Sequence, residues 1–246
     1  MNQYPKNVTL YLTEYCEMKC AFCSHAIYPQ SNFKTTNFNP ITIKEIIQNS
    51  ETFNIAGDGE VLYLNNFLDY IPDTVPDSCN LFFSTSIVPL TTQIIKELVK
   101  RKVTHIYCSI DAGDRETYNK MRGPYWNKLW HNLEKLIEIK KDQYKPIIKT
   151  TMMICNSNIH TLPKLVQKLI ELKNIECLLI YRPEKKAERS QWCNGGEEFF
   201  LDNELAIDQD KEYKYILEAI DIARNNNFNL VSRDRFLNYE YQHRQM

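Results

Sequence analysis

The sequence predicts an α/β protein built around a sheet of parallel strands. Short runs rich in β-branched and aromatic residues alternate with segments of helical period, and this alternation repeats six times up to Tyr181. A strand–helix–strand unit joins two parallel strands by a right-handed crossover. Six such units predict either an open doubly wound sheet or an incomplete barrel.

Each expected strand is a short run of apolar or β-branched residues. Such runs are shorter than most helices and match the usual length of buried strands, and polar or turn-forming residues bound them. The six expected strands cover residues 8–13, 53–56, 81–84, 105–110, 147–154 and 175–181.

The segments between the strands place apolar residues three or four positions apart, which puts them on one face of a helix. The clearest example contains Trp126, Leu129, Trp130 and Leu133. The expected helices cover residues 43–47, 66–71, 91–101, 126–137 and 162–170.

The alternation breaks after Tyr181, where a long polar connection begins. A helix over 211–224 and a short strand over 228–231 are expected to follow it. We therefore expect a core domain at 1–183 and a C-terminal extension at 184–246, made of a loop, a helix and a short strand.

Composition argues against several classes of function. The formal net charge of −1 provides no general attraction to nucleic acid or to an anionic membrane. No apolar run approaches the roughly 20 residues of a membrane span. The N-terminus has no basic region leading into an apolar one, so no secretion signal is expected. The 8 cysteines are therefore expected to be reduced thiols in the cytoplasm.

Glycine is scarce, with 6 residues in the chain, and most of them follow expected strands. A chain so sparing of glycine is expected to keep it where the backbone needs a positive φ or a close approach to another group. In parallel α/β proteins the carboxyl ends of the strands form the ligand-binding face. The glycines that predict a site at this face are Gly57, Gly59, Gly113, Gly123, Gly195 and Gly196.

Three cysteines, Cys16, Cys20 and Cys23, lie within the stretch CEMKCAFC that follows the first expected strand. Clustered thiolates bind zinc or iron–sulfur clusters. A structural zinc ion needs a fourth ligand, for which His25 is nearest, although His25 lies only two positions after Cys23. An iron–sulfur cubane held by three cysteines instead leaves one iron open to a small molecule. The residues alone thus allow a catalytic cluster or a non-catalytic zinc-binding interaction module.

Four segments, in order, resemble motifs of the radical SAM superfamily. CEMKCAFC is similar to the C-x3-C-x-aromatic-C signature of that family, with Phe22 as the aromatic residue. NIAGDGEVL at 54–62 resembles the G-x-G-E-P segment after the second strand. FFSTS at 82–86 resembles the polar end of the third strand, and CSIDAGDRETYNKMRG at 108–123 resembles the fourth-strand segment.

This resemblance implies a partial (β/α)6, TIM-like barrel that holds one 4Fe–4S cluster and S-adenosylmethionine. In that family an electron from the cluster cleaves the sulfonium, and the 5′-deoxyadenosyl radical so formed abstracts hydrogen from the substrate. The resemblance also implies an electron donor such as flavodoxin or ferredoxin. The cofactors supply the difficult chemistry, and the protein positions and shields them.

The resemblance also implies a role for individual residues. Cys16, Cys20 and Cys23 would ligate iron. The expected contacts to S-adenosylmethionine are Phe22 at adenine; Gly57, Gly59 and Glu60 at the methionyl ammonium; Ser84 and Thr85, or Ser109 and Asp111, at the ribose or the methionyl group; and Arg122 at a carboxylate. The sequence departs from the family pattern at Val61, where a proline usually follows the glutamate.

The other cysteines are not expected to bind the cluster. Cys108, Cys155 and Cys177 lie in apolar runs and should be buried, and Cys79 should be a buried or a loop thiol. Cys193 has no cysteine after it, whereas an auxiliary cluster needs several. We therefore expect a single cluster and no C-terminal auxiliary-cluster domain.

The leading hypothesis is a radical SAM oxidoreductase or modifying enzyme that acts on a small polar molecule, such as a sugar, a cyclitol or a nucleotide derivative. Related enzymes without auxiliary clusters often use such substrates. A peptide is the alternative substrate, and a glycyl-radical activase is a third possibility. A peptide would have a basic docking stretch in Arg182, Lys185, Lys186 and Arg189, although such a stretch also suits a solvated loop.

Overall fold

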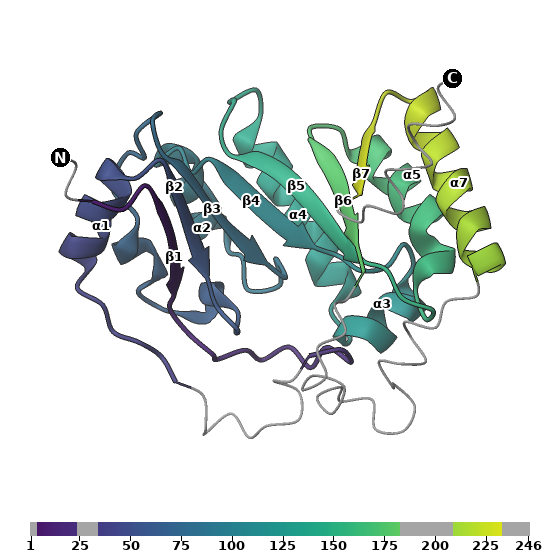
Figure 1. The fold of residues 1–246 in the computed structure, drawn as a ribbon, viewed down its shortest axis with the longest axis horizontal. Coiled ribbons are helices and arrows are strands. Elements are labelled where there is room, and N and C mark those ends of the chain that lie inside the picture. Colours follow the sequence, from purple (N-terminus) through teal and green to yellow (C-terminus); the bar gives the residue numbers. More distant parts are fainter. Residues whose placement is uncertain (1–3, 24–33, 183–208, 233–246) are drawn as a thin grey trace. The chain divides into compact units, whose positions relative to one another are not determined.

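The computed structural model describes residues 4–23, 34–182 and 209–232, and it has an α/β architecture (Figure 1). Among these residues seven strands form one sheet in the order β1-β2-β3-β4-β5-β6-β7, and the sheet is parallel and not closed. Each strand therefore neighbours the strand that precedes it in the chain. A doubly wound sheet changes direction at a switch point, so this order excludes that alternative and matches the winding of a β/α barrel.

All six strands expected in the core are confirmed, with ends that differ by at most a few residues. The strand expected after the long connection is also present. The strands are β1 (Asn7–Tyr11), β2 (Thr52–Ala56), β3 (Asn80–Thr85), β4 (His105–Ser109), β5 (Ile147–Met153), β6 (Cys177–Tyr181) and β7 (Asn229–Ser232).

The helices follow the expected segments with two differences. The segment expected as a helix at 66–71 is a short 3₁₀ helix, Phe67–Tyr70, and α3 was not expected. No helix within the described ranges has the length and apolarity needed to cross a membrane. The α-helices are α1 (Pro40–Asn49), α2 (Thr92–Lys100), α3 (Arg115–Arg122), α4 (Trp126–Lys140), α5 (Leu162–Leu172) and α7 (Gln209–Asn225).

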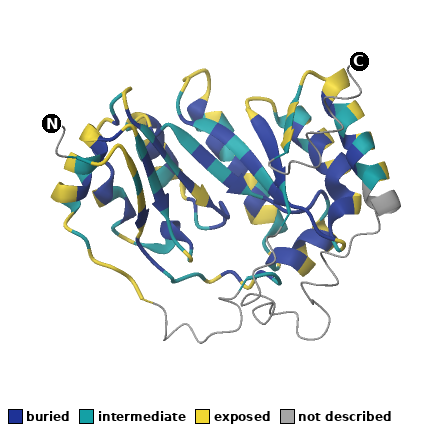
Figure 2. Ribbon diagram, in the orientation of Figure 1, coloured by how far each residue is buried: buried dark blue, intermediate teal, exposed yellow. Residues whose placement is uncertain are grey.

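In β2, β3 and β4 buried residues alternate with half-buried or exposed ones, whereas most residues of β6 are buried (Figure 2). In β2, Phe53 and Ile55 are fully buried, whereas Asn54 between them is half-buried. The same alternation in β4 leaves Tyr107 half-buried between Ile106 and Cys108. The buried face is apolar and forms the core with the helices, so the open face is the one available to a ligand.

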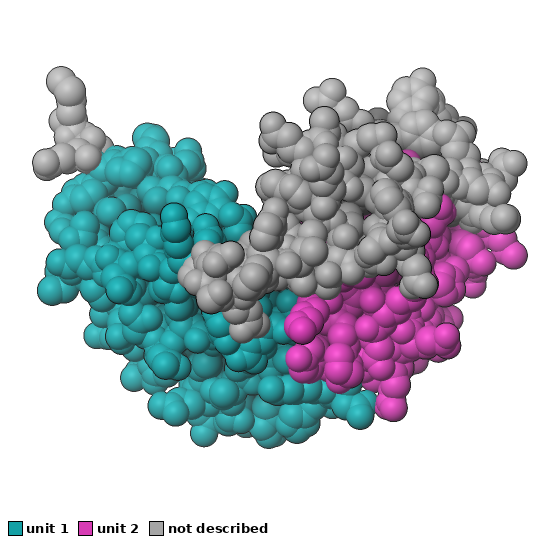
Figure 3. Space-filling model, turned by 90° about the horizontal axis from the view of Figure 1, so that it is seen from below, with its two compact units in different colours: residues 1–18, 28–108, 127–148 teal, residues 19–27, 109–126, 149–246 magenta. Residues whose placement is uncertain are grey.

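The chain divides into two compact units (Figure 3). The first contains β1, β2, β3, α1, α2 and α4, and the second contains α3, α5, β6, α7 and β7. In the second unit α5 packs against α7. The expected division at residue 183 stays a prediction. The first unit comprises residues 1–18, 28–108 and 127–148, and the second 19–27, 109–126 and 149–246.

Candidate functional site

In the first unit, the segment that leaves β1 is joined to the loop that leaves β2. The Gly59 N–H donates to the Thr13 carbonyl oxygen at 3.1 Å, and the Glu60 N–H donates to the Tyr15 carbonyl oxygen at 2.9 Å. Tyr15 in turn donates its N–H to the Thr13 hydroxyl at 2.9 Å. Cys16 is the next residue, so these bonds bring the first cysteine of the motif to the glycine loop.

The glycines of this loop are required because two backbones touch. A Cβ on Gly59 would lie 2.2 Å from the Tyr15 carbonyl oxygen, and a Cβ on Gly57 would lie 2.8 Å from the Thr13 carbonyl oxygen. Real Cβ atoms do not approach other atoms so closely. The expectation of a close approach is therefore confirmed, and the group approached is the protein's own backbone.

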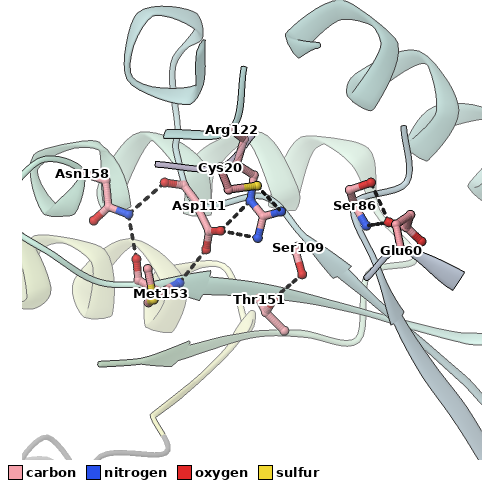
Figure 4. Close-up of polar contacts among 9 residues, drawn as sticks. All are labelled: Cys20, Glu60, Ser86, Ser109, Asp111, Arg122, Thr151, Met153 and Asn158. Carbon is pink, nitrogen blue, oxygen red and sulfur yellow. Dashed lines mark hydrogen bonds and ion pairs between the residues drawn. The ribbon is translucent and has the colours of Figure 1, made fainter. Parts of the chain in front are cut away.

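Glu60 is a buried acid at the carboxyl end of β2, with 4% of its surface exposed. Its Oε2 accepts hydrogen bonds from the N–H and the hydroxyl of Ser86, both at 2.6 Å (Figure 4). Its Oε1 accepts from the Leu62 N–H at 3.3 Å and so caps the 3₁₀ helix Val61–Tyr63. Burial raises the pKa of Glu60 above its usual value, and the Ser86 bonds offset part of this effect.

The end of β3 places Ser84, Thr85 and Ser86 in different surroundings. Ser84 is exposed and pairs in register with Tyr107, whereas Thr85 is buried and accepts from the Ile87 N–H at 2.9 Å. Ser86, which sequence reasoning missed, donates two hydrogen bonds to Glu60, and the Thr85 side chain also hydrogen-bonds to Glu60. The second serine of FFSTS was the available signal, but a serine after a strand end has no distinguishing pattern of its own.

In the second unit, the loop of Cys20 to Cys23 lies on the end of α3. The Ala21 N–H donates to the Met121 carbonyl oxygen at 2.8 Å, and the Cys23 N–H donates to the Cys20 carbonyl oxygen at 3.0 Å. Phe22 packs against Met121 and Cys155, which are both fully buried. Helix α3 therefore supports the second and third cysteines of the motif.

Arg122, the last residue of α3, joins this loop to the carboxyl end of β4 (Figure 4). Its Nη1 donates to the Cys20 Sγ at 3.8 Å, and its guanidinium lies 5.3 Å from the centre of the Phe22 ring. Nε donates to the Asp111 Oδ2 at 2.5 Å, and Nη2 pairs with the same oxygen. Burial alone would lower the pKa of Arg122, but the Asp111 carboxylate and then Cys20 raise it above its usual value.

Asp111 is fully buried and has a left-handed backbone conformation with φ of 59°. Its Oδ1 accepts from the Met153 N–H at 2.6 Å, and its carbonyl oxygen accepts from the Asn158 side chain at 2.9 Å. Aspartate is among the few residue types that adopt this conformation readily. The side chain of Asp111 is therefore held between β5 and α3 by polar contacts on both carboxylate oxygens.

Asn158, a second residue that sequence reasoning missed, organises the loop after β5. Its Nδ2 donates to the carbonyl oxygens of Asp111 and of Met153, the latter at 2.6 Å, and its Oδ1 accepts from the Cys155 N–H at 2.9 Å. Nearby in the second unit, the Thr151 hydroxyl donates to the Ser109 hydroxyl at 3.3 Å. Ser109 thus lies on the partly open face of its strand.

Tyr118 on α3 has a fully buried ring, and its hydroxyl has no hydrogen-bond partner among the described residues. Burial is the main reason that its pKa is raised above the usual value, while the Arg122 charge lowers it. Its ring meets the Trp126 ring edge-on, with centroids 5.6 Å apart. A buried donor without a partner is uncommon in folded proteins.

The expected ligands fall in different units, with Cys16 in the first and Cys20 and Cys23 in the second. Across residues 4–23, 34–182 and 209–232, no three His, Cys, Asp or Glu side chains form a group spaced to hold a metal ion. The expected burial of the other thiols is confirmed for Cys79, Cys108, Cys155 and Cys177. Outside the described residues lie His25, Lys185, Lys186, Arg189, Cys193, Gly195 and Gly196.

Comparison with known proteins identifies the family. A family model described as the radical SAM superfamily matches residues 10–169, which is more than half of the chain. No curated protein matches the sequence.

Solved structures of the same fold include SuiB from Streptococcus suis bound to S-adenosylmethionine, with a TM-score of 0.67, 16% identity and coverage of 94% of this chain and 51% of that chain. anSMEcpe with bound AdoMet has a TM-score of 0.61, 16% identity and coverage of 93% and 64%. HydG, a maturase of the [FeFe]-hydrogenase, has a TM-score of 0.59, 14% identity and coverage of 93% and 51%.

SuiB has also been solved with the precursor peptide SuiA, and anSMEcpe with the Kp18Cys peptide. The chain spans less than two thirds of each of these proteins. The likeness to these structures shows the fold, and the sequence matches the family model over both of the described sites. The chain therefore belongs to the radical SAM superfamily, whose enzymes use a 4Fe–4S cluster and S-adenosylmethionine.

Proposed function

We propose that the protein holds a 4Fe–4S cluster on Cys16, Cys20 and Cys23 and uses it with S-adenosylmethionine to remove a hydrogen atom from a small polar substrate. The observation that carries this proposal is the environment of Cys20. Its sulfur is buried, and a guanidinium donates a hydrogen bond to it. A cation beside a sulfur favours the thiolate, which is the form that ligates iron.

The donor chemistry of the three cysteines fits such a group. Three thiols within eight residues of sequence are the soft donors that iron–sulfur clusters take. A further donor on the helix that supports the loop is the buried Tyr118 hydroxyl, which has no partner within the described part of the chain and lies one turn of α3 before Arg122. When bound, the reduced cluster supplies the electron that cleaves the sulfonium of S-adenosylmethionine into methionine and a 5′-deoxyadenosyl radical.

We propose that the protein's own residues orient the adenosyl cofactor. Glu60 would accept from the methionyl ammonium beside Gly57 and Gly59. The backbone at Phe22 would contact adenine. The remaining proposed contacts are Ser84 and Thr85, or Ser109 and Asp111, at the ribose or the methionyl group, and Arg122 at a carboxylate.

A small polar substrate suits the partly open strand face. In the first unit this face carries Asn54, Ser84 and Tyr107, and in the second it carries Ser109 and Thr151. Amide and hydroxyl groups hydrogen-bond to hydroxylated ligands such as sugars, cyclitols and nucleotide derivatives. A peptide is the second candidate, because SuiB and anSMEcpe of the same fold have each been solved with a peptide.

The cluster is tested with protein purified and reconstituted without oxygen. We expect broad visible absorption, iron and sulfide in the protein, and 5′-deoxyadenosine from S-adenosylmethionine with dithionite as reductant. Cys20→Ala should lose the cluster and the product. Cys79→Ala, which alters a buried cysteine outside the motif, should keep both. A colourless, zinc-loaded protein, or equal product from Cys20→Ala, would support the zinc module instead.

The substrate class is tested separately, because a bound substrate accelerates productive cleavage of S-adenosylmethionine. A filtrate of small metabolites and a synthetic peptide pool are each added to the reduced enzyme. We expect the small-metabolite fraction to stimulate formation of 5′-deoxyadenosine. Stimulation by peptides alone would favour the peptide-modifying alternative. A flavodoxin or ferredoxin should replace dithionite as the electron donor.

A further inference from the structure

Arg122 carries a buried positive charge that touches both an acid and a cysteine sulfur. It is 8% exposed, and all three guanidinium nitrogens have partners in the second unit. Two of them face the Asp111 carboxylate, and the third faces the Cys20 Sγ at 3.8 Å. The charge therefore lies close to the sulfur at a fixed place.

The acid that holds Arg122 is itself immobilised. Asp111 is fully buried, and its second carboxylate oxygen accepts from the Met153 N–H at 2.6 Å. Asn158 holds the Asp111 carbonyl oxygen and the Met153 carbonyl oxygen with one amide group (Figure 4). The guanidinium cannot swing away from Cys20 without breaking buried polar contacts, which is costly.

We propose that Arg122 is a positioning residue that orients the Cys20 sulfur and raises the reduction potential of the cluster bound there. This inference rests on the proposed function, in which Cys20 ligates iron. The potential of an iron–sulfur cluster depends on nearby charge and on hydrogen bonds to its sulfurs. Reduction adds one negative charge, so a buried cation and an N–H donor stabilise the reduced state.

Asp111 acts on the potential in the opposite direction. Its carboxylate lies beside the guanidinium and offsets part of the positive charge seen by Cys20. Replacing Asp111 by asparagine removes that negative charge and keeps one side-chain oxygen that can accept from the guanidinium. The pair thus predicts shifts of opposite sign, whereas two residues that only support the fold would not produce that pattern.

The experiment is a redox titration of reconstituted protein, followed by electron paramagnetic resonance of the reduced cluster. In Arg122→Met we expect the ratio of reduced to oxidised cluster, at a given applied potential, to fall about tenfold, which for one electron is about 59 mV. Arg122→Lys should recover part of this loss because it keeps the charge. Asp111→Asn should raise the ratio. Arg115→Met, an exposed arginine of the same helix, should leave it unchanged.

The outcomes separate this inference from the proposed function. Wild-type protein that takes up no iron–sulfur cluster would contradict the proposed function. A wild-type cluster whose midpoint potential is the same in Arg122→Met overturns the role of Arg122. If Arg122→Met does not fold or does not take up the cluster, the midpoint potentials of Arg122→Lys and Asp111→Asn test the inference instead. An unchanged or lowered potential in Asp111→Asn overturns it.

Discussion

Gly59 occupies a position where any side chain would collide with the main chain. The atoms that a Cβ would meet are the Tyr15 carbonyl oxygen at 2.2 Å and the Glu14 carbonyl carbon at 2.5 Å. Backbone atoms cannot rotate aside, so the two loops would have to separate. The absence of a side chain at Gly59 thus lets the β2 loop hydrogen-bond to the residues that lead to Cys16.

We expect Gly59→Ala to lower the free energy of unfolding by about 2 kcal/mol or more, because the overlap must be relieved by shifts of the backbone. Urea unfolding of the protein before reconstitution measures this. Asp58→Ala changes the exposed residue between the two glycines and should alter stability by less than about 0.5 kcal/mol. A Gly59→Ala protein as stable as Asp58→Ala would contradict the close approach.

Glu60 illustrates how burial and hydrogen bonds compete at one carboxyl group. Its pKa in the folded protein is raised above 4.5, mainly by burial. At a pH between 4.5, the value for the unfolded chain, and the higher pKa of the folded chain, the folded chain binds more protons than the unfolded chain. The contribution of this group to stability is therefore fully present below pH 4.5 and is lost as the pH rises through the folded pKa.

Glu60→Gln cannot titrate, which isolates this effect. We expect the free energy of unfolding of Glu60→Gln, minus that of wild type, to increase as the pH rises through the window above 4.5. Urea unfolding at several pH values measures the difference, and a carbon NMR titration of the Glu60 carboxyl group checks the pKa directly. A difference that is independent of pH, or that decreases with rising pH, would contradict the raised pKa.

At the scale of elements, α3 and the loop after β5 together support the segment that contains the second and third cysteines of the motif. Asp114 caps the start of the helix by accepting from the Thr117 N–H at 2.9 Å, and Gly123, whose φ is 96°, caps its end. The loop is organised by Asn158. Asp111 receives contacts from both elements, so a change in the structure of either element would alter the position of Arg122.

We expect Asn158→Ala to lower the free energy of unfolding by about 2 kcal/mol or more, because one N–H and two carbonyl groups lose a buried partner at about 1–3 kcal/mol each. Asn156→Ala, at an exposed position of the same loop, should cost less. Thermal unfolding compares the two variants. Equal losses would mean that the buried amide contributes little to the loop.

At the scale of the molecule, the order of the strands determines where chemistry is available. Each crossover returns the chain to the next position in the same direction, so no crevice forms at a switch point. The motif residues lie instead at or just beyond the carboxyl ends of β1, β2, β3 and β4. This agrees with the general rule for wound parallel sheets.

The described cysteines outside the motif are poor ligands for a second cluster. Burial raises the pKa of Cys79 to about 11, and burial followed by the Glu60 charge raises the pKa of Cys108. Such thiols stay protonated and inert. We therefore expect about four irons and four sulfides per reconstituted chain, measured by colorimetric analysis. A value near eight irons would contradict a single cluster.

Much of the fold was predictable because its signals are local. The strands are runs of β-branched and aromatic residues, and α4 and α5 show apolar residues at helical spacing. Helix α3 was missed because its eight residues, RETYNKMR, are mostly polar and show no apolar stripe. Its capping residues Asp114 and Gly123 were the available signals, and these act through hydrogen bonds and backbone conformation instead of hydrophobicity.

The candidate site was predictable only where residues adjoin in the chain. The cysteine spacing alone indicated Cys20, and the family resemblance indicated Glu60, Asp111 and Arg122 as contacts with S-adenosylmethionine. The sequence did not indicate that Arg122 donates to Cys20, which lies 102 positions earlier. It also gave no role to Ser86 or Asn158, since a single serine or asparagine in a loop has no spacing to distinguish it.

Local composition and spacing were sufficient for the α/β class, the strands and the cysteine motif, because propensity and periodicity act within a turn of helix or a single strand. The winding of the sheet and the Asp111–Arg122–Cys20 contacts required the folded chain. The reason is that strand order depends on how connections pack. A buried charge likewise selects its partner only after distant segments have excluded water around it.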